Sequence, residues 1–148
     1  MGKRNIVLET DATLRKKSRD VTEFNEKLWQ LLDDMAETMY SADGVGLAAV
    51  QVGVLRRVVL VDTGDNLYEV INPIFIEQSG EQTGVEGCLS SPEEYGDVSR
   101  PMHVIVKAFD RNGREYQIEG EGLLARALCH EIDHLNGILF KDLAIELY

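Results

Sequence analysis

The sequence predicts an α+β fold in which antiparallel strands lie between two helices. Apolar residues recur at helical spacing in one segment near each end of the chain, and the segments between them are rich in strand-forming residues. These strands do not alternate with helices, which argues against a doubly wound parallel sheet. We expect residues 1–148 to form one domain, because this length and a hydrophobic fraction of 44% suffice for one core.

The first predicted helix spans residues 22–41, with Thr22 as its N-cap. Apolar residues recur there at steps of three and four, which places them on one face of a helix. They are Phe24, Leu28, Leu31, Leu32, Met35 and Met39. Glycines at positions 44, 46 and 53 predict a turn-rich stretch after this helix.

The central part of the chain is predicted to form strands. Residues 57–62, 68–77 and 104–110 are rich in Val, Ile, Tyr and Phe, which favour extended structure. Asn112-Gly113 is typical of a hairpin turn, and it predicts that the chain returns through a strand at residues 115–118.

A second helix is predicted at residues 121–135. Leu124, Leu128 and Ile132 recur there at helical spacing, and Gly137 ends the helix. Because this is the most apolar helix of the chain, any unpaired ionisable group on its buried face would be costly.

The charge balance limits the classes of partner. The formal net charge is −11, from 26 acidic and 15 basic residues, which argues against a phosphate backbone as the main partner. No apolar run reaches the roughly 18 residues that a membrane span needs, and the N-terminal apolar run is too short for a signal peptide. We expect a cytoplasmic protein without a membrane segment or a nucleic-acid-binding motif.

The second helix carries His130-Glu131-Ile132-Asp133-His134, a pattern that indicates a metal site. Residues four apart share one helix face, so His130 and His134 can bind one ion. Glu131 lies about 100° further round the helix and can act on the water of that ion instead of binding the ion. The alternative is a solvated helix with incidental histidines, although the motif uses two of only three histidines.

A third protein ligand is needed, and two cysteines and one aspartate are candidates. Cys129 and Asp133 each neighbour a histidine ligand in the helix and so point away from the shared face. Cys129 is therefore interpreted as a small buried hydrophobe. His103, which follows Pro101 at the start of a predicted strand, is interpreted as a partly exposed surface histidine. Cys88 lies beside a glycine that allows close backbone approach, but a buried structural thiol explains it equally well on chemistry alone.

The segment from Gly44 to Gln51 is only superficially similar to a phosphate-binding loop, because it lacks the lysine and the preceding strand. Either it is a tight turn packed on the first helix, or it lines a cleft to which Gln51 contributes its amide.

Three segments together resemble the peptide deformylase family in order and spacing. They are Gly44-Val45-Gly46-Leu47-Ala48-Ala49-Val50-Gln51, Glu86-Gly87-Cys88-Leu89-Ser90 and His130-Glu131-Ile132-Asp133-His134-Leu135-Asn136-Gly137. Asp11-Ala12-Thr13-Leu14-Arg15 and Arg100-Pro101 add to the resemblance, which extends to about Asp142. We therefore expect antiparallel sheets packed around a central C-terminal helix that carries the metal motif, plus one N-terminal helix.

The resemblance implies that Cys88, His130 and His134 hold one divalent metal ion, with water as the fourth ligand. Iron(II) is the expected ion, with Zn²⁺, Ni²⁺ or Co²⁺ as alternatives. It also implies a reaction: hydrolytic removal of the formyl group from the N-terminal formylmethionine of nascent polypeptides, with release of formate. Glu131 would be the general acid/base, and the Gln51 amide and the Leu89 backbone N–H would stabilise the oxyanion.

The resemblance further implies a peptide site. Val45, Gly46 and Gly87 would bind the substrate backbone as a strand added to an edge. The methionine side chain would lie in an apolar pocket formed by three residues of the second helix, namely Leu123, Arg126 and Ala127. The expected partners are N-formylmethionyl peptides and nascent chains, with a transient ribosome contact, and we take the protein to be a monomer by default.

Three departures from the family pattern are visible. Cys129 stands where glutamine is usual, so a hydrogen bond to the metal site would be missing or replaced. Ala12 stands where proline is usual, and the chain ends soon after the metal motif.

Two other functions remain open. A zinc endopeptidase would need a third ligand further along the chain, where Asp142 and Glu146 are available but no histidine. A structural or regulatory metal module would have a closed four-coordinate site.

Overall fold

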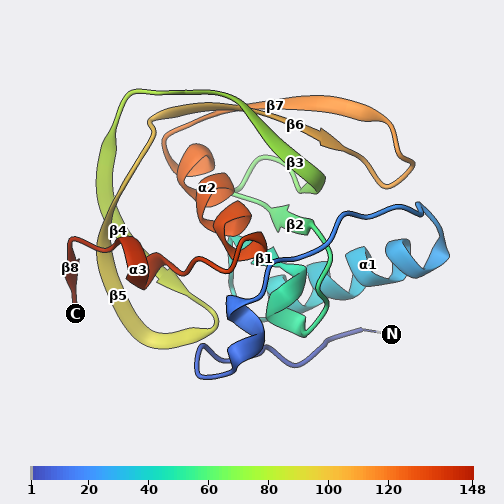
Figure 1. Cartoon of the computed structure of the whole chain (residues 1–148), viewed down its shortest axis with the longest axis horizontal. Coiled ribbons are helices and arrows are strands. Elements are labelled where there is room, and N and C mark those ends of the chain that lie inside the picture. The colour runs from blue at the N-terminus through green and yellow to red at the C-terminus, as the bar shows by residue number, and fades with distance from the viewer. Residues whose placement is uncertain (1) are drawn as a thin grey trace.

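The computed structural model describes residues 2–148 and has the predicted α+β class (Figure 1). The helices are α1 (Glu26–Ser41), α2 (Leu123–Leu135) and α3 (Phe140–Leu143), with 3-10 turns at Ala12–Arg15 and Ala49–Val52. The strands are β1 (Gly46–Ala48), β2 (Val58–Val61), β3 (Tyr68–Ser79), β4 (Gln82–Cys88), β5 (Ser91–Arg100), β6 (His103–Phe109), β7 (Glu115–Glu121) and β8 (Glu146–Leu147).

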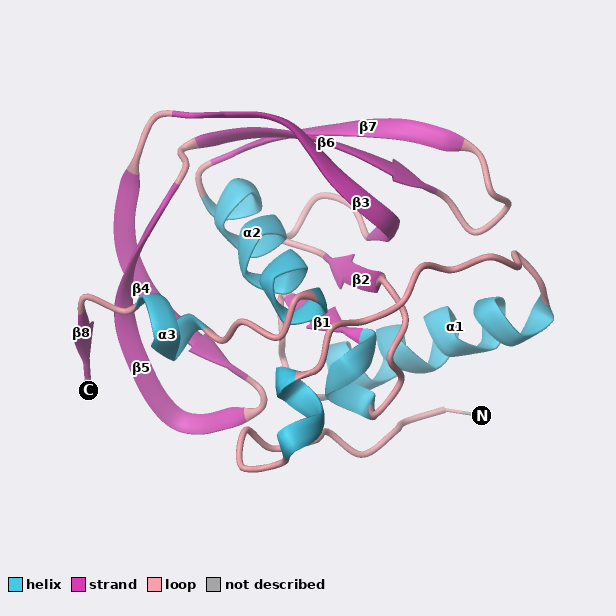
Figure 2. Ribbon diagram, in the orientation of Figure 1, coloured by secondary structure: helices cyan, strands magenta, loops and turns pink. Residues whose placement is uncertain are grey.

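The strands form two antiparallel sheets. One has the order β1-β2-β3-β6-β7 and the other the order β4-β5-β8, so β1 and β4 each lie at the edge of their sheet. Helix α2 lies in the middle, with strands on several sides of it (Figure 2). The expected arrangement of antiparallel sheets around the C-terminal helix is therefore confirmed. No helix within residues 2–148 is long and apolar enough to cross a membrane.

Strand β2 separates the two hydrophobic clusters of the core. Val59 and Val61 pack toward α2, whereas Val58 and Leu60 pack toward α1. Successive side chains of a strand point to opposite faces, so a strand covered by helices on both sides needs a continuous apolar run. This explains the continuous apolar sequence Val-Val-Leu-Val and places β2 between α1 and α2.

The start of α1 differs from the prediction. The helix begins at Glu26, and its N-cap is Asn25, whose side chain accepts a hydrogen bond from the Leu28 N–H at 3.3 Å. Thr22 is not the cap, because the chain just before it is held to β3. The Asn72 side chain accepts from the Val21 N–H at 2.8 Å and donates to the Val21 carbonyl at 2.9 Å.

Helix α2 begins two residues later than predicted, at Leu123, because Glu121 still belongs to β7. Gly122 separates the two elements with a φ of 60°, a conformation that glycine adopts without strain. The predicted strands at 57–62, 68–77, 104–110 and 115–118 correspond to β2, β3, β6 and β7. The sequence did not predict β1, β4, β5, β8 or α3.

Candidate metal centre

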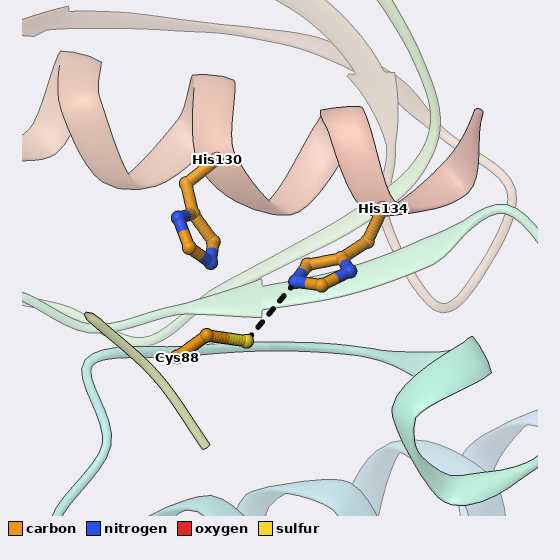
Figure 3. A group of neighbouring side chains, drawn as sticks. All are labelled: Cys88, His130 and His134. Atoms are coloured by element: carbon orange, nitrogen blue, oxygen red, sulfur yellow. Dashed lines mark hydrogen bonds between the residues drawn. The ribbon is translucent and has the colours of Figure 1, made fainter. Parts of the chain in front are cut away.

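Cys88, His130 and His134 lie together at the centre of the molecule. Cys88 ends strand β4, and the two histidines stand one turn apart on α2. Their ligand atoms all lie within 4.8 Å of one another, and the Cys88 Sγ is 3.3 Å from the His134 Nε2. Figure 3 shows the thiol and both imidazoles facing the same space. A thiol and two imidazoles are a donor set that suits iron or zinc, so these residues fit a divalent metal ion.

The two imidazoles have different surroundings. His134 is fully buried, burial lowers its pKa to about 3, and its Nδ1 has no hydrogen-bond partner among the described residues. A neutral imidazole is the form that binds a metal. The Nδ1 of His130 is 2.9 Å from the Glu86 Oε1, which leaves the His130 Nε2 for the shared space.

Glu131 lies beside the ligand group without belonging to it. Its Oε2 is 3.9 Å from the His130 Nε2, and its Oε1 is buried with no partner in the described chain. Burial raises the pKa of Glu131 to about 7. A carboxylate with this pKa can take up and release a proton near neutral pH, as general acid–base catalysis requires.

Gly46 lies directly against Glu131. A Cβ at position 46 would lie only 2.6 Å from the Glu131 Oε2 and 2.9 Å from its Cδ, closer than side chains pack. The backbone of β1 can therefore approach the carboxylate only because residue 46 is glycine.

A buried ion network supports His130. Glu86 accepts hydrogen bonds from Arg100 (2.9 Å to each carboxylate oxygen) and from Arg126 (2.7 Å), besides its contact with His130. Burial alone would raise the pKa of Glu86, but the contacts with Arg100 and His130 outweigh burial and hold it at about 2. Arg100 also contacts Asp133 at 2.6 Å. A carboxylate that orients a ligand histidine is a common second element of metal sites.

Glu86 and Arg100 stand in the sequence as parts of motifs, and no role was predicted for either residue. The available signal was two basic residues, Arg100 in the Arg100-Pro101 pair that resembles the family and Arg126 on the apolar second helix. Buried guanidinium groups need a buried acid as partner. No pattern in the sequence indicated that this acid would also contact His130.

Gln51 and Leu89, the two predicted donors to the oxyanion, line the same cavity as Cys88. The Gln51 side chain is buried, with its Nε2 3.4 Å from the Cys88 Sγ and 3.1 Å from the Ser90 Oγ. Its Oε1 accepts from the Ala48 N–H at 2.9 Å, which directs the amide nitrogen toward the site. Leu89 follows Cys88 and lines the adjoining cavity.

A cavity of about 530 Å³ opens in front of Glu131. All six residues expected to bind substrate line it: Val45, Gly46, Gly87, Leu123, Arg126 and Ala127. The edge strands β1 and β4 contribute Gly46 and Gly87, so two unpaired strand edges border the cavity. Glu86 binds the guanidinium group of Arg126, so the methylene groups of Arg126 can form an apolar part of the cavity wall.

The residues set aside by the sequence analysis lie outside the ligand group. Cys129 is buried in the hydrophobic core, and burial raises its pKa to about 11. Asp133 pairs with Arg100, and half-buried His103 contacts Glu119 at 2.6 Å on the surface. The interpretation of Cys129 as a buried hydrophobe and of His103 as a partly exposed surface histidine is therefore confirmed.

Known proteins of one family match the chain over nearly its full length. The family model described as polypeptide deformylase matches residues 3–147. The peptide deformylase of Thermoanaerobacter pseudethanolicus is 61% identical over 135 residues, which cover 91% of this chain and 85% of that protein. That of Alkaliphilus metalliredigens is 54% identical over 146 residues and 99% of both chains.

Solved structures agree with the sequence comparisons. The crystal structure of the Thermotoga maritima peptide deformylase has a TM-score of 0.96 at 39% identity and covers 99% of this chain and 100% of its own. The Legionella pneumophila enzyme has a TM-score of 0.92 at 46% identity and covers 95% of this chain and 85% of its own. The chain therefore belongs to the polypeptide deformylase family of metal-dependent hydrolases, which remove the formyl group from the N-terminal methionine of nascent peptides.

Proposed function

We propose that Cys88, His130 and His134 hold one Fe²⁺ ion, and that Glu131 is the general acid/base of deformylation. The observation that carries this proposal is the juxtaposition of three ligand atoms within 4.8 Å of one another with a buried carboxylate beside them. A structural metal site with four protein ligands has no bound water, so it would not need a carboxylate beside the ligands. The donor set also suits Zn²⁺, Ni²⁺ or Co²⁺, so metal analysis decides between them.

When bound, a divalent ion supplies Lewis acidity and lowers the pKa of water toward neutrality. In our proposal Glu131 accepts the proton of the attacking water and passes it to the amine that leaves. The Gln51 Nε2 and the Leu89 backbone N–H donate hydrogen bonds to the formyl oxygen as negative charge develops there. Loss of one such donor typically costs roughly a hundredfold or more in rate.

The substrate backbone would lie extended between β1 and β4, paired with Val45 and Gly87 and passing Gly46. Both strands end their sheets, so their outer backbone groups are available for pairing. Leu123, Arg126 and Ala127 would form the wall that receives the methionine side chain. Arg126 would serve this role through its methylene groups, because its guanidinium group is already bound by Glu86.

We further propose that residues 1–148 act as one catalytic domain and as a monomer. Because the substrates are nascent chains, we place the protein in the cytoplasm and expect a transient contact with the ribosome.

Formate release from a formyl-Met-Ala-Ser peptide tests the proposal, with protein purified without oxygen and with its metal content measured. The Glu131→Ala variant should keep its metal and lose activity, because the substitution removes the proton carrier and no ligand. An internal peptide with blocked ends is the control for endopeptidase activity and should stay intact. Metal-loaded wild-type protein that releases no formate would refute the proposed function.

A further inference from the structure

The short helix α3 lies against the outer side of the substrate cavity, and its residues contact separate parts of the molecule. The ring of buried Phe140 stacks on that of His130, with centroids 6.0 Å apart and an interplanar angle of 22°. Asp142 forms an ion pair with Arg15, one contact of which measures 3.0 Å. Helix α3 is therefore attached both to a ligand histidine and to the N-terminal segment.

Between these two anchors, Lys141 reaches the wall of the cavity. Its Nζ donates to the Glu9 Oε1 at 2.8 Å and to the Glu94 Oε1 at 2.7 Å. Glu94 lines the cavity, whereas Lys141 is not among the described residues that line it. Hydrogen bonds from Lys141 to Glu9 and Glu94 raise the pKa of the lysine, so it remains a cation.

The cavity wall at Glu94 is a bulge in the ladder between β4 and β5. Ser91 pairs with Cys88 and Tyr95 pairs with Gly87, so residues 92–94 stand between two consecutive pairs of the register. All three line the cavity. Glu93 has a φ of 65°, a left-handed conformation that is strained for a residue other than glycine. This bulge therefore needs support from outside the ladder.

Glu9 supplies the support at the other end of the bulge. Its Oε2 accepts from the Ser91 Oγ at 3.0 Å, and its N–H donates to the Ser90 carbonyl at 2.9 Å. Since the same carboxylate binds Lys141, one ammonium group joins both ends of the bulge through Glu9 and Glu94. We call these three side chains, Glu9, Glu94 and Lys141, the clasp.

We propose that Lys141 is a positioning residue that holds residues 92–94 in the shape that binds the formylated peptide. This inference rests on the proposed substrate cavity. The hydrogen bonds and ion pairs of Lys141 go to Glu9 and Glu94, and within the described residues none goes to a ligand residue or to Glu131. The effect of Lys141 should therefore fall on substrate binding and leave the chemical step unchanged. The clasp is also partly exposed, with 23% of the Lys141 side chain and 46% of the Glu94 side chain accessible, so salt should weaken it.

Steady-state kinetics of the metal-loaded protein test this proposal with an uncharged, amidated formyl-Met peptide. Lys141→Met should raise KM roughly three- to tenfold, as expected for loss of two partly exposed ion pairs, with kcat within about twofold of wild type. Lys141→Arg should restore KM, and high salt should raise the wild-type KM toward that of the Met variant. Arg15→Gln is the matched control, because it breaks an ion pair of the same helix and removes no hydrogen bond of the clasp, although it also removes a charge near Glu9.

Deuterium uptake by residues 90–96 gives a second readout that needs no turnover. Lys141→Met should increase uptake in this segment, and Arg15→Gln should not. Unchanged uptake together with unchanged KM in Lys141→Met would overturn the proposal, as would an equal rise in KM in Arg15→Gln. If the wild-type protein released no formate, the proposed function would fail, and the uptake of residues 90–96 would still decide the role of Lys141.

Discussion

Replacing Gly46 by alanine should disable Glu131 without removing a metal ligand. Gly46 has no positive φ, so alanine is compatible with the backbone at this position. The added methyl group instead meets the Glu131 carboxylate, with the Cβ 2.6 Å from the Oε2, whereas ordinary van der Waals contact begins at 3.4 Å. Glu131 is only 5% exposed, so its carboxylate has to move within the site, toward the adjoining cavity, to relieve the overlap.

The size of the effect follows from this overlap. Relief needs a shift of about 0.8 Å, and overpacking of this kind typically costs about 1–3 kcal/mol of stability. A catalytic group displaced by about 1 Å loses roughly a hundredfold in rate. We therefore expect Gly46→Ala to lower kcat roughly a hundredfold while the protein retains its metal.

A double-mutant cycle isolates the contact between the two residues. Chemical denaturation of wild type, Gly46→Ala, Glu131→Ala and the double variant gives the cost of the methyl group with and without the carboxylate. We expect that cost to fall below about 0.5 kcal/mol in the Glu131→Ala background, since the overlapping atoms are gone. An equal cost in both backgrounds, or a wild-type kcat for Gly46→Ala, would refute the reasoning.

Three further predictions concern the surroundings of the site. Glu86→Gln should lower metal affinity about ten- to hundredfold, because it weakens the contact that orients the ligand His130. Competition with a chelator measures the affinity, and an unchanged value would contradict the role of Glu86. In metal-free protein an alkylating reagent should modify Cys88 before Cys129, because burial raises the pKa of Cys129 to about 11 and the thiolate is the reactive form. Mass spectrometry measures the labelling, and equal labelling of the two cysteines would contradict this prediction. The hydrogen bond to Glu119 raises the pKa of His103, so the stability from this pair is present at low pH and is lost as pH rises through the raised pKa. An NMR titration of Glu119→Gln should show a lower midpoint for His103, and an unchanged midpoint would exclude the pair as the cause.

The elements that the sequence predicted are those with a strong local pattern. The stripe of α2 and the continuous apolar run of β2 were recognisable because burial on one face or both faces selects apolar residues. Strands β4 and β5 were missed because their sequences are rich in glycine and acidic residues, and their extended form depends on pairing with each other. The predicted start of α1 was wrong because Asn72, distant in sequence, binds the backbone of Val21 through two hydrogen bonds.

Within the site, the sequence alone determined the relation between His130, Glu131 and His134. Their relative positions follow from the geometry of one helix, which is local. On chemistry alone Cys88 was as well explained by a structural thiol, and only the resemblance to a family favoured a ligand role. Tertiary structure brings Cys88 to within 3.3 Å of His134 across 46 residues of chain.

The remaining contacts also depend on the fold. Glu86 behind His130, Gly46 against Glu131 and Lys141 behind the cavity wall each join segments far apart in the chain. Their positions depend on the register of the sheets and on how α2 and α3 pack against them. Residue spacing along one element cannot encode such contacts, because a shift of one residue in strand register turns every side chain to the opposite face.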